Sequence, residues 1–153
     1  MGLFLIYVGA VTLSINSISI TPRFTLTRHE RLKSRKLIEQ LFKSGKSFSN
    51  YPLRILYLLI DKGHAPLQSG FAVSKKNFKK AVDRNRIKRL MKEGYRLQKN
   101  SLTHKLDHHN KYMTVFFIYT GNDLPLYNTV AEKINIALNR LEKIADESVA
   151  SIT

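Results

Sequence analysis

The sequence predicts an α+β fold in which helices cover a small sheet. Residues 30–44 and 126–147 carry apolar side chains at helical spacing, with polar and charged side chains between them. The segment YMTVFFIYT, residues 112–120, is almost entirely β-branched or aromatic, which is typical of strands. In chain order the predicted elements are a helix, two strands, a helix, a strand and a helix. This order favours a sheet covered by helices.

The first three predicted elements are a helix at residues 30–44 and strands at residues 51–60 and 67–74. Gly45 follows the helix, where a C-terminal cap glycine belongs. The first strand, YPLRILYLLI, is rich in Leu, Ile and Tyr, and the turn DKGHAP separates it from the second strand, LQSGFAVS. The apolar face of the helix comprises Leu32, Leu37, Ile38, Leu41 and Phe42.

The second half of the chain begins with a basic helix after Ser74. The segment SLTHKLDHHN, residues 101–110, is interpreted as a polar connection that leads to the strand at residues 112–120. The last helix, at residues 126–147, has a continuous apolar stripe that we expect to face the core. The stripe comprises Val130, Ile134, Ala137, Leu138, Leu141, Ile144 and Ala145.

Positive charge is concentrated in two segments. The 153 residues include 26 Lys and Arg against 11 Asp and Glu, a formal net charge of +15. Residues 28–46 hold 7 basic and 2 acidic residues (+5), and residues 75–99 hold 11 and 2 (+9). This excess favours a polyanionic partner, nucleic acid before an anionic membrane surface. The absence of cysteine excludes disulfides, thiolate metal sites and cysteine nucleophiles, and it suits a cytoplasmic location.

The basic helix, which includes KKAVDRNRIKRL at residues 79–90, has one apolar and one basic side. Gly94 on the apolar side costs about 1 kcal/mol relative to Ala, unless another backbone approaches it closely. A solvated face is the alternative interpretation, but such faces mix signs, whereas this one nearly excludes acids. We therefore expect a nucleic-acid face. The apolar side comprises Ile87, Leu90, Met91, Gly94 and Tyr95, and the basic side comprises Arg84, Lys88, Arg89, Lys92 and Arg96.

Residues 1–21 are predicted to lie outside the working domain, which we place at residues 22–148 with a tail at 149–153. The first twenty residues are apolar and uncharged, without the positive residues that a signal peptide carries ahead of its apolar run. The run is also shorter than the roughly 20 apolar residues of a membrane-spanning helix. An unusual membrane anchor and an extra strand are alternatives to the upstream extension that we favour. We expect no membrane partner.

The segment SKKNFKKAVDRNRIKRLMKEGYR, residues 74–96, resembles the protein subunit of bacterial ribonuclease P. The signature of that family is a Ser-Lys-Lys strand end, an Ala-Val step, and Arg-Asn-Arg-x-Lys-Arg on the helix. These appear here at residues 74–76, 81–82 and 84–89. RLKSRKLIEQLFKSGKSFSN, YMTVFFIY and the final helix also follow the family in order and spacing. The resemblance covers about residues 24–144.

The resemblance implies a small α/β sandwich with a mixed sheet and a left-handed β-α-β crossover. It implies that the protein binds a catalytic RNA and the 5′ leader of precursor tRNA, in a particle whose cleavage leaves the mature tRNA 5′ end. The residues that match the RNA-contacting region, with the neighbouring helix lysine, are Lys75, Lys76, Arg84, Asn85, Arg86, Lys88, Arg89 and Lys92.

A leader cleft between the first helix and the sheet is also implied by the resemblance. We expect Phe42, Ile38, Tyr57 and Phe71 to line it, because aromatic faces stack on unpaired bases of any sequence. Ile38 occupies a position that is often aromatic in the family, so one stacking partner would be missing. Plain core packing is the alternative role for the three aromatic residues.

The chemistry of cleavage is implied to belong to the RNA, with Mg²⁺ held mainly by the RNA subunit. We therefore expect no catalytic residue and no metal site in the protein. His104, His108 and His109 with Asp107 have ligand-like spacing, but their polar connection favours a solvated loop. A non-catalytic, ribosomal-type RNA-binding protein is the alternative function. A helix-turn-helix DNA-binding protein is disfavoured, because the basic helix lies between strands.

Overall fold

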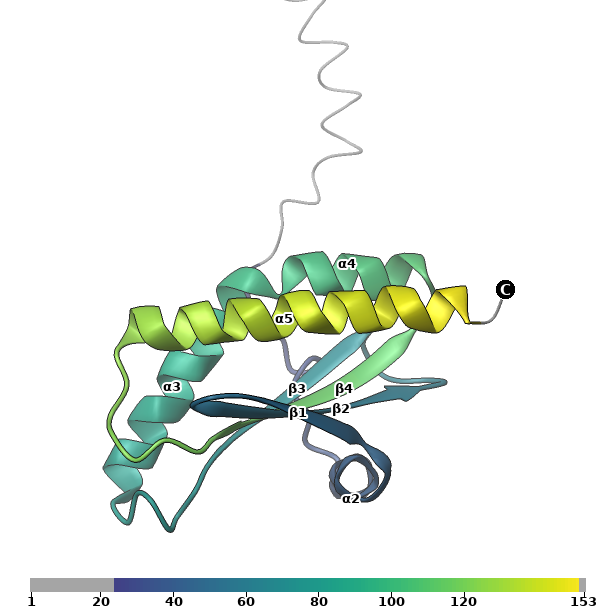
Figure 1. Ribbon diagram of the computed structural model, residues 1–153. Helices are drawn as coiled ribbons and strands as arrows, with labels where there is room; N and C mark the ends of the chain where they lie inside the picture. Colours follow the sequence, from purple (N-terminus) through teal and green to yellow (C-terminus); the bar gives the residue numbers. More distant parts are fainter. Residues whose placement is uncertain (1–23, 152–153) are drawn as a thin grey trace, which may run out of the picture.

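The structure, a computed structural model, describes residues 24–151. The predicted extension at residues 1–21 lies outside the described residues. Within residues 24–151 the α+β prediction is confirmed: a four-stranded sheet in the order β1-β2-β4-β3 has helices on both faces. Figure 1 shows α4 and α5 along one face of the sheet and α2 on the opposite face.

The sheet is mixed, as the family resemblance implies. β1 (Lys46–Asn50) and β2 (Leu53–Ile60) are antiparallel, and β2 is antiparallel to β4 (Tyr112–Tyr119). β3 (Leu67–Val73) pairs with β4 in parallel, and the chain between them passes through two helices. The β-α-β unit is therefore present, and its left hand stays a prediction.

Two elements were not predicted. α4 (Asn100–His108) occupies the segment that we interpreted as a polar connection, so that interpretation was wrong. The helix forms because Leu102 and Leu106, four residues apart, are both fully buried against the core. β1 has a single buried apolar residue, Phe48, so its sequence shows no alternation that would predict a strand.

The first helix begins later than its periodicity predicts. α2 (Arg35–Ser44) is capped by Ser34, whose Oγ accepts a hydrogen bond from the Leu37 amide at 3.4 Å. The preceding backbone instead pairs with the outer edge of β3, where the Leu32 amide donates to Ser69 O at 2.8 Å and the Ser69 amide donates to Glu30 O at 2.9 Å. Residues 30–32 therefore extend the sheet and do not begin the helix.

The remaining helices keep their predicted faces. α3 (Ala81–Gln98) buries Ile87, Met91, Gly94 and Tyr95, with Leu90 only half-buried. α5 (Tyr127–Ala150) buries the predicted stripe apart from Ile144, which is half-buried, and it continues past the predicted end at residue 147. None of the helices in residues 24–151 is long and apolar enough to cross a bilayer.

The sheet separates two cores of unequal size. Met113, Val115 and Phe117 of β4 face the larger core, beneath α3, α4 and α5. Phe116 and Ile118 point the other way, toward the smaller core under α2. Because successive side chains of a strand alternate between faces, this division assigns every residue of the neighbouring strands to one side.

Candidate functional site

The basic side of α3 is held by a tightly packed apolar side. A Cβ atom built on Gly94 would lie 3.3 Å from the Ala131 Cα of α5, so the glycine allows the two helix backbones to approach closely. This contact explains a glycine in mid-helix, as we predicted for a close backbone approach. α3 is therefore anchored in position with its cations facing outward.

Lys75 and Lys76 lie in the loop between β3 and α3, and both are exposed. The loop is anchored by its other residues. The Asn77 Nδ2 donates to Thr120 O at 3.0 Å and to Gly121 O at 3.1 Å, and Phe78 is buried beside Tyr119 with ring centroids 5.9 Å apart. The lysines are thus displayed by a fixed loop at the start of the basic helix.

Arg84 differs from the other cations of α3 because its side chain hydrogen-bonds to the backbone of the preceding loop. Its Nη1 donates to Phe78 O at 2.8 Å and to Lys79 O at 2.6 Å, and the side chain is half-buried. The sequence predicts Arg84 on the basic side of the helix, and in the structure its side chain folds back onto the loop that precedes that helix. A guanidinium has five N–H donors, so others stay available to a ligand.

The other predicted RNA-contacting residues of α3 face solvent. Asn85, Arg86, Arg89 and Lys92 are exposed, and Lys88 is half-buried. Within residues 24–151, none of these four cations forms a salt bridge. The structure therefore brings together a row of uncompensated cations on one helix, which is the electrostatic pattern of a phosphate-binding face.

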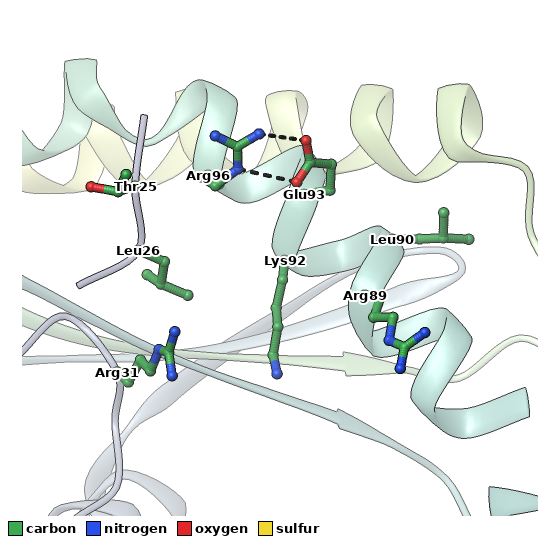
Figure 2. A pocket seen from close by; sticks show the side chains of 8 residues that line it. All are labelled: Thr25, Leu26, Arg31, Arg89, Leu90, Lys92, Glu93 and Arg96. Carbon is green, nitrogen blue, oxygen red and sulfur yellow. Dashed lines mark hydrogen bonds and ion pairs between the residues drawn. The ribbon is translucent and has the colours of Figure 1, made fainter. Parts of the chain in front are cut away.

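Arg31 joins the second basic segment to this helix. It lies in the segment paired with β3, and it lines a groove beside Arg89 and Lys92 (Figure 2). It also lines a neighbouring groove whose other cations are Arg28 and Lys33. The two basic segments of the sequence, residues 28–46 and 75–99, therefore meet in space at Arg31. Sequence reasoning placed Arg31 in a basic segment but did not assign it to the site.

A buried ion pair fixes the segment that carries Arg31. The Lys99 Nζ, which is almost fully buried, donates to Glu30 Oε1. Burial opposes ionisation of Glu30, but the hydrogen bonds from Lys99 and from the Thr27 amide outweigh it and lower the pKa of that carboxyl. The Glu30 carboxylate therefore stays ionised near neutral pH, and its hydrogen bond to Lys99 holds residues 27–31 against the junction of α3 and α4.

The four residues predicted to line one cleft lie on two faces of the sheet. Phe42 and Ile38 of α2 pack on the smaller core. Tyr57 and Phe71 face the larger core, where Tyr57 lies beside Phe48 and Phe71 stacks on Phe117 at 5.4 Å. The prediction of a shared cleft was therefore wrong for Tyr57 and Phe71, whose positions in β2 and β3 point away from α2.

Other residues lie on the sheet face beside α2, where the cleft was expected. Phe42 is 52 % exposed, and its ring meets the Phe116 ring edge-on with centroids 5.5 Å apart. A Cβ on Gly70 would lie 2.5 Å from the Phe116 ring, so the glycine makes room for that ring over β3. Arg54, exposed on the same face, pairs in register with Ile118. Alternation in YMTVFFIY separates Phe116 and Ile118 from the buried positions and could have indicated this face.

The histidine cluster lies on α4 and at the residue that follows it. The His108 and His109 rings meet edge-on at the end of α4 with centroids 5.3 Å apart, and the His109 Nε2 lies 3.7 Å from Asp146 Oδ1. Lys105 donates to the same Asp146 carboxylate at 2.8 Å. In the described part of the chain, no group of three or more His, Asp or Glu side chains is placed to hold an ion.

Comparison with known proteins identifies relatives over most of the chain. The model of the Ribonuclease P family matches residues 26–142. The ribonuclease P protein component of Porphyromonas gingivalis is 39% identical over 121 residues, which cover 78% of this chain and 88% of that protein. The one from Chlorobium phaeobacteroides is 48% identical over 82 residues, covering 51% of this chain and 56% of that protein.

Solved structures of this family share the fold. The ribonuclease P protein from Thermotoga maritima is 28% identical with a TM-score of 0.58, over 72% of this chain and 96% of that one. The Staphylococcus aureus protein has a TM-score of 0.51 at 24% identity, over 76% of this chain and 94% of that one.

Proposed function

The chain belongs to the ribonuclease P protein family, and from this premise we propose that it binds the catalytic RNA of ribonuclease P and the 5′ leader of precursor tRNA. As the protein subunit of that enzyme, it would support the endonucleolytic step that produces the mature tRNA 5′ end. The observation that carries the proposal is the row of uncompensated cations on α3, continued by Arg31. When such a row binds RNA phosphates, it releases their condensed counterions into solution, and this release is a large source of protein–RNA affinity.

The protein would act by binding and positioning. We assign the catalytic groups and the Mg²⁺ ions to the RNA subunit, as the resemblance to the family implies. The protein would lower the phosphate repulsion between the catalytic RNA and its substrate and fix the substrate in place. Precursor tRNA is made in the bacterial cytoplasm, so the proposal places the protein there.

The leader would lie on the sheet face beside α2. Phe42 and Phe116 expose parts of two aromatic rings there, and Arg54 supplies a cation on the same face. Stacking of an unpaired base on an aromatic ring contributes about 1–3 kcal/mol and tolerates any sequence. Tyr57 and Phe71 would support this face from behind by packing in the larger core.

Reconstitution tests the proposal. Cleavage of a precursor tRNA by a bacterial ribonuclease P RNA is measured at low Mg²⁺ concentration, with and without the protein. We expect the protein to raise the cleavage rate and to shift the Mg²⁺ requirement downward. If the protein binds the RNA without stimulating cleavage, the non-catalytic RNA-binding alternative is correct.

A further inference from the structure

A groove of about 600 Å³ lies between residues 25–31 and the second half of α3. Its volume falls in the range of small-ligand sites, about 300–1,000 Å³. Arg31, Lys92 and Arg89 all line it, and Figure 2 shows Arg31 and Leu26 on one side and Lys92 and Arg89 of α3 on the other. The groove therefore combines cations with an apolar surface in a volume that one nucleotide could occupy.

Arg96 and Glu93 build one wall of this groove. The Arg96 Nη1 donates to Phe24 O at 2.5 Å, and the same guanidinium holds the Glu93 carboxylate through Nε at 3.1 Å and Nη2 at 2.5 Å. The hydrogen bond from Arg96 lowers the pKa of Glu93, so the pair is ionised and its charges cancel. Arg96 therefore holds residue 24 against α3 and contributes no net charge to the groove.

The other end of the wall is fixed as well. The Glu30–Lys99 ion pair and the backbone pairing of residues 30–32 with Ser69 hold the segment next to Arg31. The groove is thus held at both ends by interactions that do not use its three remaining cations. A site formed in this way before binding loses little conformational entropy when a ligand enters.

The three remaining cations lack an acidic partner. Within residues 24–151, Arg31, Arg89 and Lys92 form no salt bridge, while Glu93, the acid of the groove, is occupied by Arg96. Like charges that share a groove repel one another, and an anion relieves this repulsion. Arginine donors suit phosphate oxygens in particular, because the planar fork can hold two oxygens at once.

The apolar part of the groove restricts the kind of phosphate ligand. Leu26 and Leu90 are half-buried and line the groove beside the cations. A paired RNA strand presents phosphates, but its base faces are stacked inside the helix and cannot cover a leucine. An unpaired nucleotide presents a phosphate and a free base face together.

We propose that this groove binds one unpaired nucleotide of an RNA chain. Its phosphate lies on Arg31, Arg89 and Lys92, and its base covers Leu26 and Leu90. The inference rests on the RNA-binding function proposed above and adds a defined subsite with its ligand class. Arg31 is the phosphate-binding residue contributed from outside α3, and Arg96 is a positioning residue.

Methyl resonances test the ligand class directly. The full chain is titrated with a short 5′-phosphorylated single-stranded RNA and, separately, with a blunt RNA duplex that has the same number of phosphates. We expect the Leu26 and Leu90 methyl signals to shift with the single strand and to stay in place with the duplex. Equal shifts with both RNAs, or shifts with neither, would overturn the assignment of an unpaired nucleotide.

Two substitutions separate the phosphate contact from the base contact. Arg31→Ala should lower affinity for the single strand and reduce the slope of log affinity against log salt by about 1. Leu26→Ala should lower the affinity for the single strand with the slope unchanged. Lys143→Ala, which removes an exposed cation of α5, is the matched control and should leave both quantities unchanged. Circular dichroism confirms that each variant folds.

The source of the nucleotide is found with the assembled enzyme. If it belongs to the catalytic RNA, Arg31→Ala weakens binding of that RNA even without substrate. If it belongs to the leader, the variant binds the RNA normally but loses affinity for precursor tRNA with a long leader. Wild-type affinity in both assays, together with normal stimulation of cleavage, would refute the subsite and leave the proposed function intact.

Discussion

Arg84 and Arg86 are two positions apart in the same motif, yet they have different neighbours. Arg84 donates two hydrogen bonds to the loop before α3, whereas Arg86 is exposed and has no salt bridge among residues 24–151. A motif interpreted as one RNA-binding unit therefore contains one side chain that binds the preceding loop and one that faces solvent. Substitution of Arg86 should therefore affect RNA binding, whereas substitution of Arg84 should affect the stability of the protein.

We expect Arg86→Ala to weaken binding of the catalytic RNA without changing the stability of the protein. Because the side chain is exposed, its loss removes about one phosphate contact, which lowers the salt slope of binding by about 1. The affinity is measured by filter binding over a range of salt concentrations. An unchanged slope would show that this arginine does not contact phosphate.

For Arg84→Ala the expected change is a loss of stability of about 1 kcal/mol. The substitution removes both hydrogen bonds from Nη1 to the Phe78 and Lys79 carbonyls. Urea unfolding monitored by circular dichroism measures the free energy of unfolding. Arg86→Ala serves as the matched control, and equal stability of the two variants would contradict the structural role of Arg84.

The Glu30–Lys99 ion pair connects stability to pH. Glu30→Gln leaves Lys99 buried without its charged partner, which we expect to lower the free energy of unfolding by about 3 kcal/mol at neutral pH. Since the pKa of Glu30 is lowered in the folded state, this stabilisation is complete above the ordinary glutamate pKa of about 4.3 and is lost as the pH falls through the lower folded value.

Denaturant unfolding between neutral and acidic pH checks this expectation. The difference in stability between the wild type and Glu30→Gln should shrink as the pH falls below about 4. Glu39→Gln, on the exposed side of α2, is the control and should show no such difference. A difference that stays constant down to acidic pH would mean that ionisation of Glu30 contributes nothing.

At the scale of elements, the contact between α3 and α5 depends on Gly94. Gly94→Val places a branched side chain where even a Cβ lies 3.3 Å from the Ala131 Cα and 3.4 Å from the Ile134 Cδ1. We expect overpacking to cost about 1–3 kcal/mol of stability, despite the better helix propensity of valine. Thermal unfolding measures the loss. Leu97→Val, on the exposed side of the same helix, should cost less, and an equal cost for both would exclude overpacking.

Periodicity located the elements that have many apolar residues and missed those that have few. α3, α5 and the three longer strands carry several buried side chains each, so their patterns are readable from the sequence. β1 and α4 bury one and two apolar residues and depend on neighbours that the sequence does not place beside them. Their formation is a tertiary effect, which local patterns do not report.

The sequence predicted the site residues that lie on one helix better than it predicted which residues of different elements lie together. The exposed cations of α3 followed from helical spacing and from the family motif. The cleft prediction failed for Tyr57 and Phe71 because the face of a strand residue changes with every position, and one residue of register decides it. Arg31 could not be assigned to the site from the sequence. Its position beside α3 depends on the pairing of residues 30–32 with β3, which is a contact between distant parts of the chain.

For the whole molecule, we expect residues 1–20 to be dispensable. The family match begins at residue 26, so a protein that starts at Thr21 retains the matched region in full. It should melt at the same temperature as the full chain and stimulate precursor-tRNA cleavage equally. Loss of folding or of stimulation on this truncation would show that the segment belongs to the working domain.

The pairing of residues 30–32 with β3 has a consequence for how the protein behaves in concentrated solution. An uncovered strand edge offers free amides and carbonyls to another chain, which is a route to aggregation. Here the Glu30 carbonyl and the Leu32 amide occupy the Ser69 position of one outer edge, and the other edge is the short β1, which starts with Lys46. A protein whose positive charge must stay free for RNA thus keeps its sheet from recruiting copies of itself. Truncation beyond Leu32 would uncover that edge and should lead to self-association.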